Sequence, residues 1–307
     1  MTRRDGHDGP VVYAHPEYLV STEWLAEHHR DPGVRVLDVT ARLTSTLDNV
    51  AHDRCFVEGH IPGSVAFDSP SAKGALSDPG AELPWMWPTP DRVSGSLRAA
   101  GVHTGDRVVI TARTPRAGLD SGTMWCTRAW WTLHHMGVDV AIHHGGVESW
   151  EAAGLPVESG PVAVTPGTIT VTRHGLDARA TAADVLAALD DDDACVVDAL
   201  SAANYAGVDP GYGPRRGHIT GAHNLPYLSL ISAETAGFLD APALRSALDG
   251  LGLFDRPRVI TYCGGAIAAT VVAFALALFD HPAVAVYDGS LMEWSRDPSL
   301  PMTDPSV

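Results

Sequence analysis

The sequence predicts an α/β protein made of two tandem domains, each with a central parallel β-sheet flanked by helices. Short runs rich in β-branched residues alternate with segments of helical periodicity, as in proteins whose helices cross over between parallel strands. The runs are apolar along their length, which is typical of strands covered on both faces. Several landmarks also occur twice in the same order, and this indicates a duplicated domain.

Each half of the chain supplies its own strands and helices. In the first half, strands are predicted at residues 34–39, 108–111 and 138–142, and helices at 22–29 and 123–136. In the second half, strands are predicted at residues 195–198, 259–262 and 283–287, and helices at 181–189 and 266–279. Apolar residues recur at helical spacing in the last helix, so one of its faces is expected to pack on the sheet.

The repeated landmarks set the domain boundaries. The run Gly59-His60-Ile61-Pro62-Gly63 returns as Gly217-His218-Ile219-Thr220-Gly221. Similar strands precede and follow both copies, and each half closes on a glycine-containing turn that leads to a tryptophan. We therefore predict a first domain at residues 11–156, a linker rich in proline, glycine and serine at 157–168, and a second domain at 169–307.

The composition excludes several classes of function. A formal net charge of -16 argues against a nucleic-acid partner, because no basic surplus is present to neutralise phosphates. The first ten residues lack the apolar core of a signal peptide. The longest apolar run, at residues 266–279, is too short to span a membrane. We expect a cytoplasmic protein without membrane contact.

One of the four cysteines stands in an unusual setting. Cys55, Cys126, Cys195 and Cys263 form no C-x-x-C pair and no zinc spacing, so free thiols and no metal site are predicted. The first three fit buried structural cysteines, a common place for this residue type. Cys263 instead ends a predicted strand and is followed by two glycines and an apolar helix.

The position of Cys263 predicts a reactive thiolate. Reaction sites in open α/β sheets lie beyond the carboxyl ends of the strands. Gly264 and Gly265 allow the backbone N–H groups of the loop to turn toward the sulfur, and the following helix adds the positive end of its dipole. Such a setting lowers the pKa of a thiol from about 8.5 to about 3.5–7.5. We therefore predict a nucleophilic cysteine that is ionised at neutral pH.

Taken together, these elements resemble the two-domain rhodanese sulfurtransferases, which include thiosulfate and 3-mercaptopyruvate sulfurtransferases. The resemblance rests on the repeat, the two Gly-His-Ile elements, the setting of Cys263 and the closing run at residues 287–294. It implies two tandem rhodanese-like domains, of which the second is catalytic. Aligning residues 107–111 on 258–262 places Ala112 opposite Cys263, so the first domain is expected to be inactive.

The resemblance also implies a reaction. Cys263 would take a sulfane sulfur from 3-mercaptopyruvate, thiosulfate or another persulfide, without a metal or organic cofactor. The loop that would hold the resulting persulfide consists of Gly264, Gly265, Ala266, Ile267 and Ala268. A small thiol, cyanide or a protein thiol such as thioredoxin would then accept the sulfur.

The chain departs from the family where relatives bind their donors. The basic pair of thiosulfate enzymes is missing from the loop, and so is the hydroxyl that mercaptopyruvate enzymes carry at the position of Gly265. Two arginines that hold the donor's carboxylate in relatives are replaced by Leu200 and Ala206. Arg215 and Arg216 are the candidates to substitute for them. We therefore expect a different donor, which is either a larger or less anionic molecule or a protein persulfide.

Two alternatives follow from the same residues. A phosphatase or arsenate reductase on this fold needs an arginine about six residues after the cysteine, and Ala269 occupies that position. The missing arginines keep open a second alternative to the sulfurtransferase, a catalytically degenerate module for binding or sulfur relay. A Cys263 that accepts sulfur would distinguish the enzyme from the degenerate module.

Overall fold

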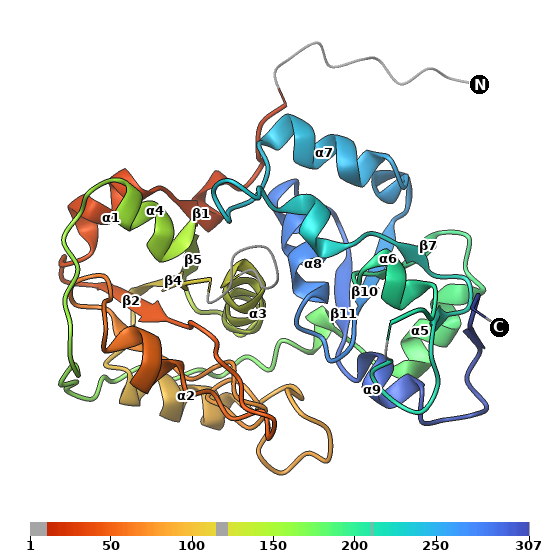
Figure 1. Ribbon diagram of the computed structural model, residues 1–307, viewed down its shortest axis with the longest axis horizontal. Coiled ribbons are helices and arrows are strands. Elements are labelled where there is room, and N and C mark those ends of the chain that lie inside the picture. The colour runs from red at the N-terminus through yellow and green to blue at the C-terminus, as the bar shows by residue number, and fades with distance from the viewer. Residues whose placement is uncertain (1–10, 115–121, 210, 307) are drawn as a thin grey trace.

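The computed structural model describes residues 11–114, 122–209 and 211–306. The first ten residues, which are predicted to lack a signal-peptide core, lie outside this part of the chain. The protein forms two lobes, each around its own sheet (Figure 1). Within the described residues, no helix has both the length and the apolar character needed to cross a membrane.

The first lobe contains a parallel sheet with the strand order β1-β5-β4-β2-β3. Its strands are β1 (Leu19–Val20), β2 (Val34–Asp38), β3 (Val65–Ala66), β4 (Arg107–Thr111) and β5 (Val140–His143). Its helices are η1 (Pro16–Tyr18), α1 (Thr22–His28), η2 (His52–Phe56), α2 (Pro90–Ala99), α3 (Gly122–His135) and α4 (Gly146–Ala152).

The second lobe repeats this topology with the order β6-β11-β10-β7-β9, again parallel. The strands of this sheet are β6 (Arg179–Ala180), β7 (Ala194–Asp198), β9 (His223–Asn224), β10 (Arg258–Tyr262) and β11 (Val284–Tyr287). Its helices are η3 (Leu176–Ala178), α5 (Ala182–Leu189), α6 (Ala202–Tyr205), η4 (Tyr227–Leu230), α7 (Ala241–Asp249), η5 (Leu253–Asp255), α8 (Ala269–Leu278) and α9 (Ser290–Trp294). A separate antiparallel pair joins β8 (His218–Ile219) to β12 (Met302–Thr303).

The predicted pair of α/β domains with central parallel sheets is confirmed, and the duplication extends to single residues. Ala112 directly follows β4, as Cys263 directly follows β10. His60 and His218 each place Nδ1 2.8 Å from the carbonyl of an aromatic residue and stack on the ring of that residue. The two histidines therefore have the same structural role in both halves.

One predicted helix begins later than the periodicity suggests. The expected helix at residues 266–279 starts at Ala269, as α8. Ala266 has a φ of +61°, a left-handed conformation that a regular right-handed helix does not contain. Residues 263–268 therefore form a separate loop between β10 and α8.

The linker packs along the first lobe. Residues 157–168 contain no helix and no strand longer than a single bridge. The N–H of Gly167 donates to the carbonyl of Arg98 at 2.8 Å, and the N–H of Val171 donates to Ser94 Oγ at 2.8 Å. These contacts continue past the predicted end of the linker at residue 168, and the first element of the second lobe, η3, begins at Leu176.

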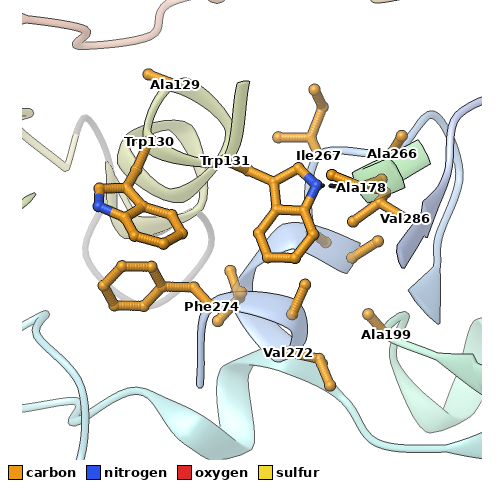
Figure 2. Close-up of a cluster of buried hydrophobic side chains, with 14 of the residues drawn as sticks. Ala129, Trp130, Trp131, Ala178, Ala199, Ala266, Ile267, Val272, Phe274 and Val286 are labelled. Carbon is orange, nitrogen blue, oxygen red and sulfur yellow. Dashed lines mark hydrogen bonds between the residues drawn. The ribbon is translucent and has the colours of Figure 1, made fainter. Parts of the chain in front are cut away.

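Helices α3 and α8 join the two lobes (Figure 1). Figure 2 shows Trp130 and Trp131 of α3 beside Phe274 of α8. The rings of Trp130 and Phe274 meet edge to face with centroids 4.7 Å apart, and Trp131 Nε1 donates to the carbonyl of Ala178 at 3.2 Å. One hydrophobic core runs through both lobes as a result. These two tryptophans therefore serve the packing of the core and of the two domains against each other.

Candidate active site

Cys263 lines a cavity of about 920 Å³ between the two domains. The second domain contributes the loop after β10 together with Leu200, Tyr212 and Tyr227. The charged and tryptophan side chains in the wall all come from the first domain, and they are Arg42, Glu58, Trp85, Arg113, Trp125 and Glu151. The cavity therefore belongs to both halves of the duplication, although only one half carries the cysteine.

Backbone N–H groups surround the sulfur of Cys263. Those of Gly265, Ile267 and Ala269 interact with the thiol and favour its negatively charged form. Gly265 and Ile267 belong to the predicted loop. Ala269 lies just after the loop, and its N–H is free to face the sulfur because it is the first residue of α8. The N–H of Ala266 points elsewhere, to Ser290. This arrangement is suited to an anionic sulfur.

The pKa of Cys263 is nevertheless raised above the ordinary value of a cysteine thiol, so the prediction of a thiolate at neutral pH is wrong. Burial of the side chain is the largest cause, because a charged sulfur loses its hydration. The three N–H groups lower the pKa without outweighing burial, and the negative charge of Asp198 raises it further. Cys263 is thus a thiol at neutral pH, and its thiolate fraction increases as the pH rises toward its pKa.

Aromatic rings explain why glycines follow the cysteine. A Cβ atom on Gly264 would overlap the ring of Tyr212, and one on Gly265 would lie 3.0 Å from the ring of Trp85. The two glycines therefore let a ring from each domain lie directly on the loop. Burial raises the pKa of Tyr212 to about 12, so its hydroxyl stays protonated at neutral pH.

Ser290 holds the loop from behind. Its Oγ accepts the N–H of Cys263 at 3.3 Å and that of Ala266 at 3.1 Å, and it donates to the carbonyl of Tyr287 at 2.8 Å. Sequence reasoning missed this role. The signal available in the sequence is the Asp288-Gly289-Ser290 run, which closes the second half of the repeat.

We expect Ser290→Ala to destabilise the protein by about 1–3 kcal/mol, because two buried N–H groups lose their acceptor. Urea unfolding measures the loss, and the rate of alkylation of Cys263 measures the damage to the loop. Ser45→Ala is a suitable control, since Ser45 is exposed. An unchanged unfolding midpoint in Ser290→Ala would show that the loop does not depend on this hydroxyl.

The structure does not bring Arg215 and Arg216 to the cavity. The guanidinium of Arg215 donates to backbone carbonyls of the C-terminal segment, including those of Trp294 at 2.7 Å and Leu300 at 2.8 Å. Arg216 is exposed. Their place in the sequence beside Gly217 indicated proximity to the site but could not indicate the direction of the side chains.

Two arginines of the first domain line the cavity instead. Arg113 forms a two-point ion pair with Glu151, with N–O distances of 2.8 and 2.6 Å. The guanidinium of Arg42 has no ion-pair partner within the described part of the chain. Leu200, at the position where relatives carry an arginine, lines the same cavity. Among the described residues, those that the second domain contributes to the wall therefore include no cation.

The other cysteines differ in their access to this cavity. Cys126 and Cys195 are buried, and burial raises the pKa of both thiols. Cys55 is half-buried and lines the cavity, which a purely structural role does not require. In the residues described, no group of three or more His, Cys, Asp or Glu side chains is arranged to hold a metal ion.

A family model, curated relatives and a solved structure all match this chain to rhodanese-type sulfurtransferases. The rhodanese-like domain model matches residues 21–153 and 181–297. The 3-mercaptopyruvate sulfurtransferase of Escherichia coli K12 is 35% identical over 294 residues, which cover 93% of this chain and 97% of that protein. The thiosulfate sulfurtransferase of Bos taurus is 30% identical over 285 residues, covering 90% and 91%. The crystal structure of SseA from Escherichia coli, a 3-mercaptopyruvate sulfotransferase, superposes with a TM-score of 0.75 at 33% identity, covering 89% of this chain and 98% of that chain.

Proposed function

The chain belongs to the rhodanese family and is a sulfurtransferase of the thiosulfate and 3-mercaptopyruvate type, and from this premise we propose that Cys263 carries the transferred sulfur. The observation that supports this most directly is the ring of three backbone N–H groups around its sulfur, inside the interdomain cavity. The equivalent position in the first domain is Ala112, which cannot act as a nucleophile.

The proposed reaction has two steps. The Cys263 thiol loses its proton, and the thiolate attacks the outer sulfur of the donor. The bond that held this sulfur breaks, its electron pair stays with the remainder of the donor, and a cysteine persulfide forms. An acceptor thiolate or cyanide then attacks the outer sulfur of the persulfide, and Cys263 leaves as a thiolate. The N–H groups of Gly265, Ile267 and Ala269 stabilise the anionic sulfur in both steps.

The cavity wall supports a donor that is larger and less anionic than thiosulfate. Four aromatic side chains line the cavity, and they are Trp85, Trp125, Tyr212 and Tyr227. The two lining arginines are balanced by the lining carboxylates of Glu58 and Glu151. We therefore propose the persulfide of a small organic thiol as donor, because an aromatic and nearly neutral pocket suits organic groups better than a small dianion.

The position of the sulfur also bears on the acceptor. Cys263 is only 2% exposed, so an acceptor must reach it through the cavity. This supports a small thiol or cyanide as acceptor over a protein thiol such as thioredoxin, whose sulfur would have to approach past the residues at the cavity rim.

Mass spectrometry of the intact protein tests the proposal. The protein is incubated separately with thiosulfate, 3-mercaptopyruvate and glutathione persulfide, and the modified residue is located by peptide mapping. We expect a gain of one sulfur, about 32 Da, on Cys263 that cyanide removes. Glutathione persulfide should load fastest. Sulfur located on another cysteine would overturn the assignment of the nucleophile, and faster loading by thiosulfate would overturn the assignment of the donor.

A further inference from the structure

We propose that Arg128, a residue of the inactive first domain, is a positioning residue that holds the Cys263 loop in shape and stabilises the negatively charged forms of its sulfur. This inference rests on the proposed role of Cys263 as the nucleophile. It assigns to the first domain a direct part in the reaction, beyond that of covering the site.

Arg128 lies on the face of α3 that meets the second domain. Its side chain is 3% exposed, and its guanidinium lies 3.5 Å from the carbonyl of Ala266, in the middle of the cysteine loop. The same group lies 3.5 Å from the carboxylate of Asp288 and donates to the carbonyl of Trp85. Ser290, two residues after Asp288 in the chain, binds the N–H groups of Cys263 and Ala266 in the same loop.

Ala266 needs these contacts because its conformation is strained. A left-handed φ of +61° costs a non-glycine residue about 1–2 kcal/mol. Ser290 Oγ fixes the N–H of Ala266, and Arg128 binds its carbonyl. The adjacent bond between Thr127 Oγ1 and Thr270 Oγ1, 2.8 Å long, ties α3 to the start of α8. The first domain thus holds the backbone that presents the N–H groups to the sulfur.

The charge balance around Arg128 favours a nearby anion. Arg128 and Arg179 share the single carboxylate of Asp288, at N–O distances of 3.5 and 3.4 Å, and neither has another ion pair in the part of the chain that the structure describes. Arg179 is 33% exposed, whereas Arg128 is buried beside the loop, so the charge of Arg128 is only partly compensated by the shared carboxylate, which is costly for a buried cation. The pKa of Arg128 is lowered mainly by its burial and is raised by Asp288 and by the charge on Cys263. A thiolate or persulfide at Cys263 supplies the missing negative charge.

Other titratable groups also act on Cys263. Asp198, at the end of β7, raises its pKa and is itself raised to about 6 by burial, so it is ionised at pH 8. Tyr212 in the cavity wall stays protonated at that pH because burial raises its pKa to about 12, and Asp288 behind the loop is paired with Arg128 and Arg179. Charged side chains of the first domain also line the cavity: Arg113 and Glu151 are paired with each other, and Arg42 and Glu58 contribute one charge of each sign. Arg128 and Asp198 are therefore expected to shift the pKa of Cys263 in opposite directions.

The test is the pH dependence of alkylation of Cys263 by iodoacetamide in the full-length protein. Arg128→Met removes the cation, so the pKa of Cys263 should rise and the alkylation rate at pH 8 should fall about tenfold, which corresponds to one pKa unit. Arg128→Lys keeps the charge and should retain most of the rate. Asp198→Asn removes the opposing anion and should increase the rate. Near-UV circular dichroism and urea unfolding verify that each variant is folded.

Clear outcomes would overturn the proposal. The first is an Arg128→Met variant in which the pH dependence of alkylation is the same as in the wild type. The second is a folded Arg128→Lys variant that loses as much of the alkylation rate as Arg128→Met, because the positive charge would then not be the cause of the effect. If Arg128→Met does not fold, Asp288→Asn replaces it: the cation is then less compensated, and alkylation at pH 8 must become faster for the proposal to hold. Alkylation needs no sulfur donor, so this result is independent of whether any donor loads Cys263.

Discussion

Replacing Cys263 with serine is expected to reduce sulfur transfer by at least about a thousandfold with every donor, because a serine hydroxyl is not ionised near neutral pH and cannot form a persulfide. The substitution changes one atom in a buried position that makes its polar contacts through backbone N–H groups, so the fold should be retained. Steady-state production of thiocyanate from cyanide measures the rate, and circular dichroism verifies the fold.

The informative control for this prediction is Cys55→Ser. Cys55 lines the same cavity as a half-buried free thiol, whereas Cys126 and Cys195 are buried away from it. We expect Cys55→Ser to keep most of the wild-type rate. If Cys263→Ser retains activity and Cys55→Ser loses it, the nucleophile belongs to the first domain. The conclusion that Ala112 makes the first domain inactive would then be wrong.

The fold could be predicted from the sequence because its strongest signals are local. The central strands β2, β4, β7 and β10 are short runs rich in apolar and β-branched residues, and the duplication repeats them in order. The outer strands β1, β3, β6 and β9 contain two residues each, too few for any periodicity to show. Their positions follow from pairing with the central strands, which is a property of the assembled sheet.

The candidate site could be predicted only in part, for a related reason. Position after β10 and the two glycines indicated Cys263, but its pKa depends on burial beneath side chains that are distant in the sequence. Trp85, Arg128 and Tyr212 approach the loop from three separate segments. Arg215 shows the converse case, because it is close in sequence to the site while its guanidinium binds the C-terminal segment. Contacts made across the domain interface carry no pattern that a single sequence displays.

Replacing Trp130 with alanine is expected to destabilise both domains together, by about 3–5 kcal/mol. The side chain is fully buried, stacks on His134, packs edge to face on Phe274 of the other domain, and donates from Nε1 to the carbonyl of Val140 at 2.9 Å. Alanine leaves a cavity at the interface and an unpaired carbonyl in β5. Urea unfolding, followed by fluorescence and circular dichroism, measures the loss as a shift of the midpoint.

The cooperativity of this transition is the decisive part of the result. Since one hydrophobic core runs through both domains, we expect a single transition in the wild type and in Trp130→Ala, with both probes shifting equally. Leu186→Ala, at a site on α5 that is 37% exposed, should change stability by less than about 0.5 kcal/mol. Two separate transitions, of which only one responds to Trp130→Ala, would show that the domains fold independently. In that case the contacts of α3 with the Cys263 loop would be too weak to hold a strained alanine, and the proposed role of Arg128 would lose its structural basis.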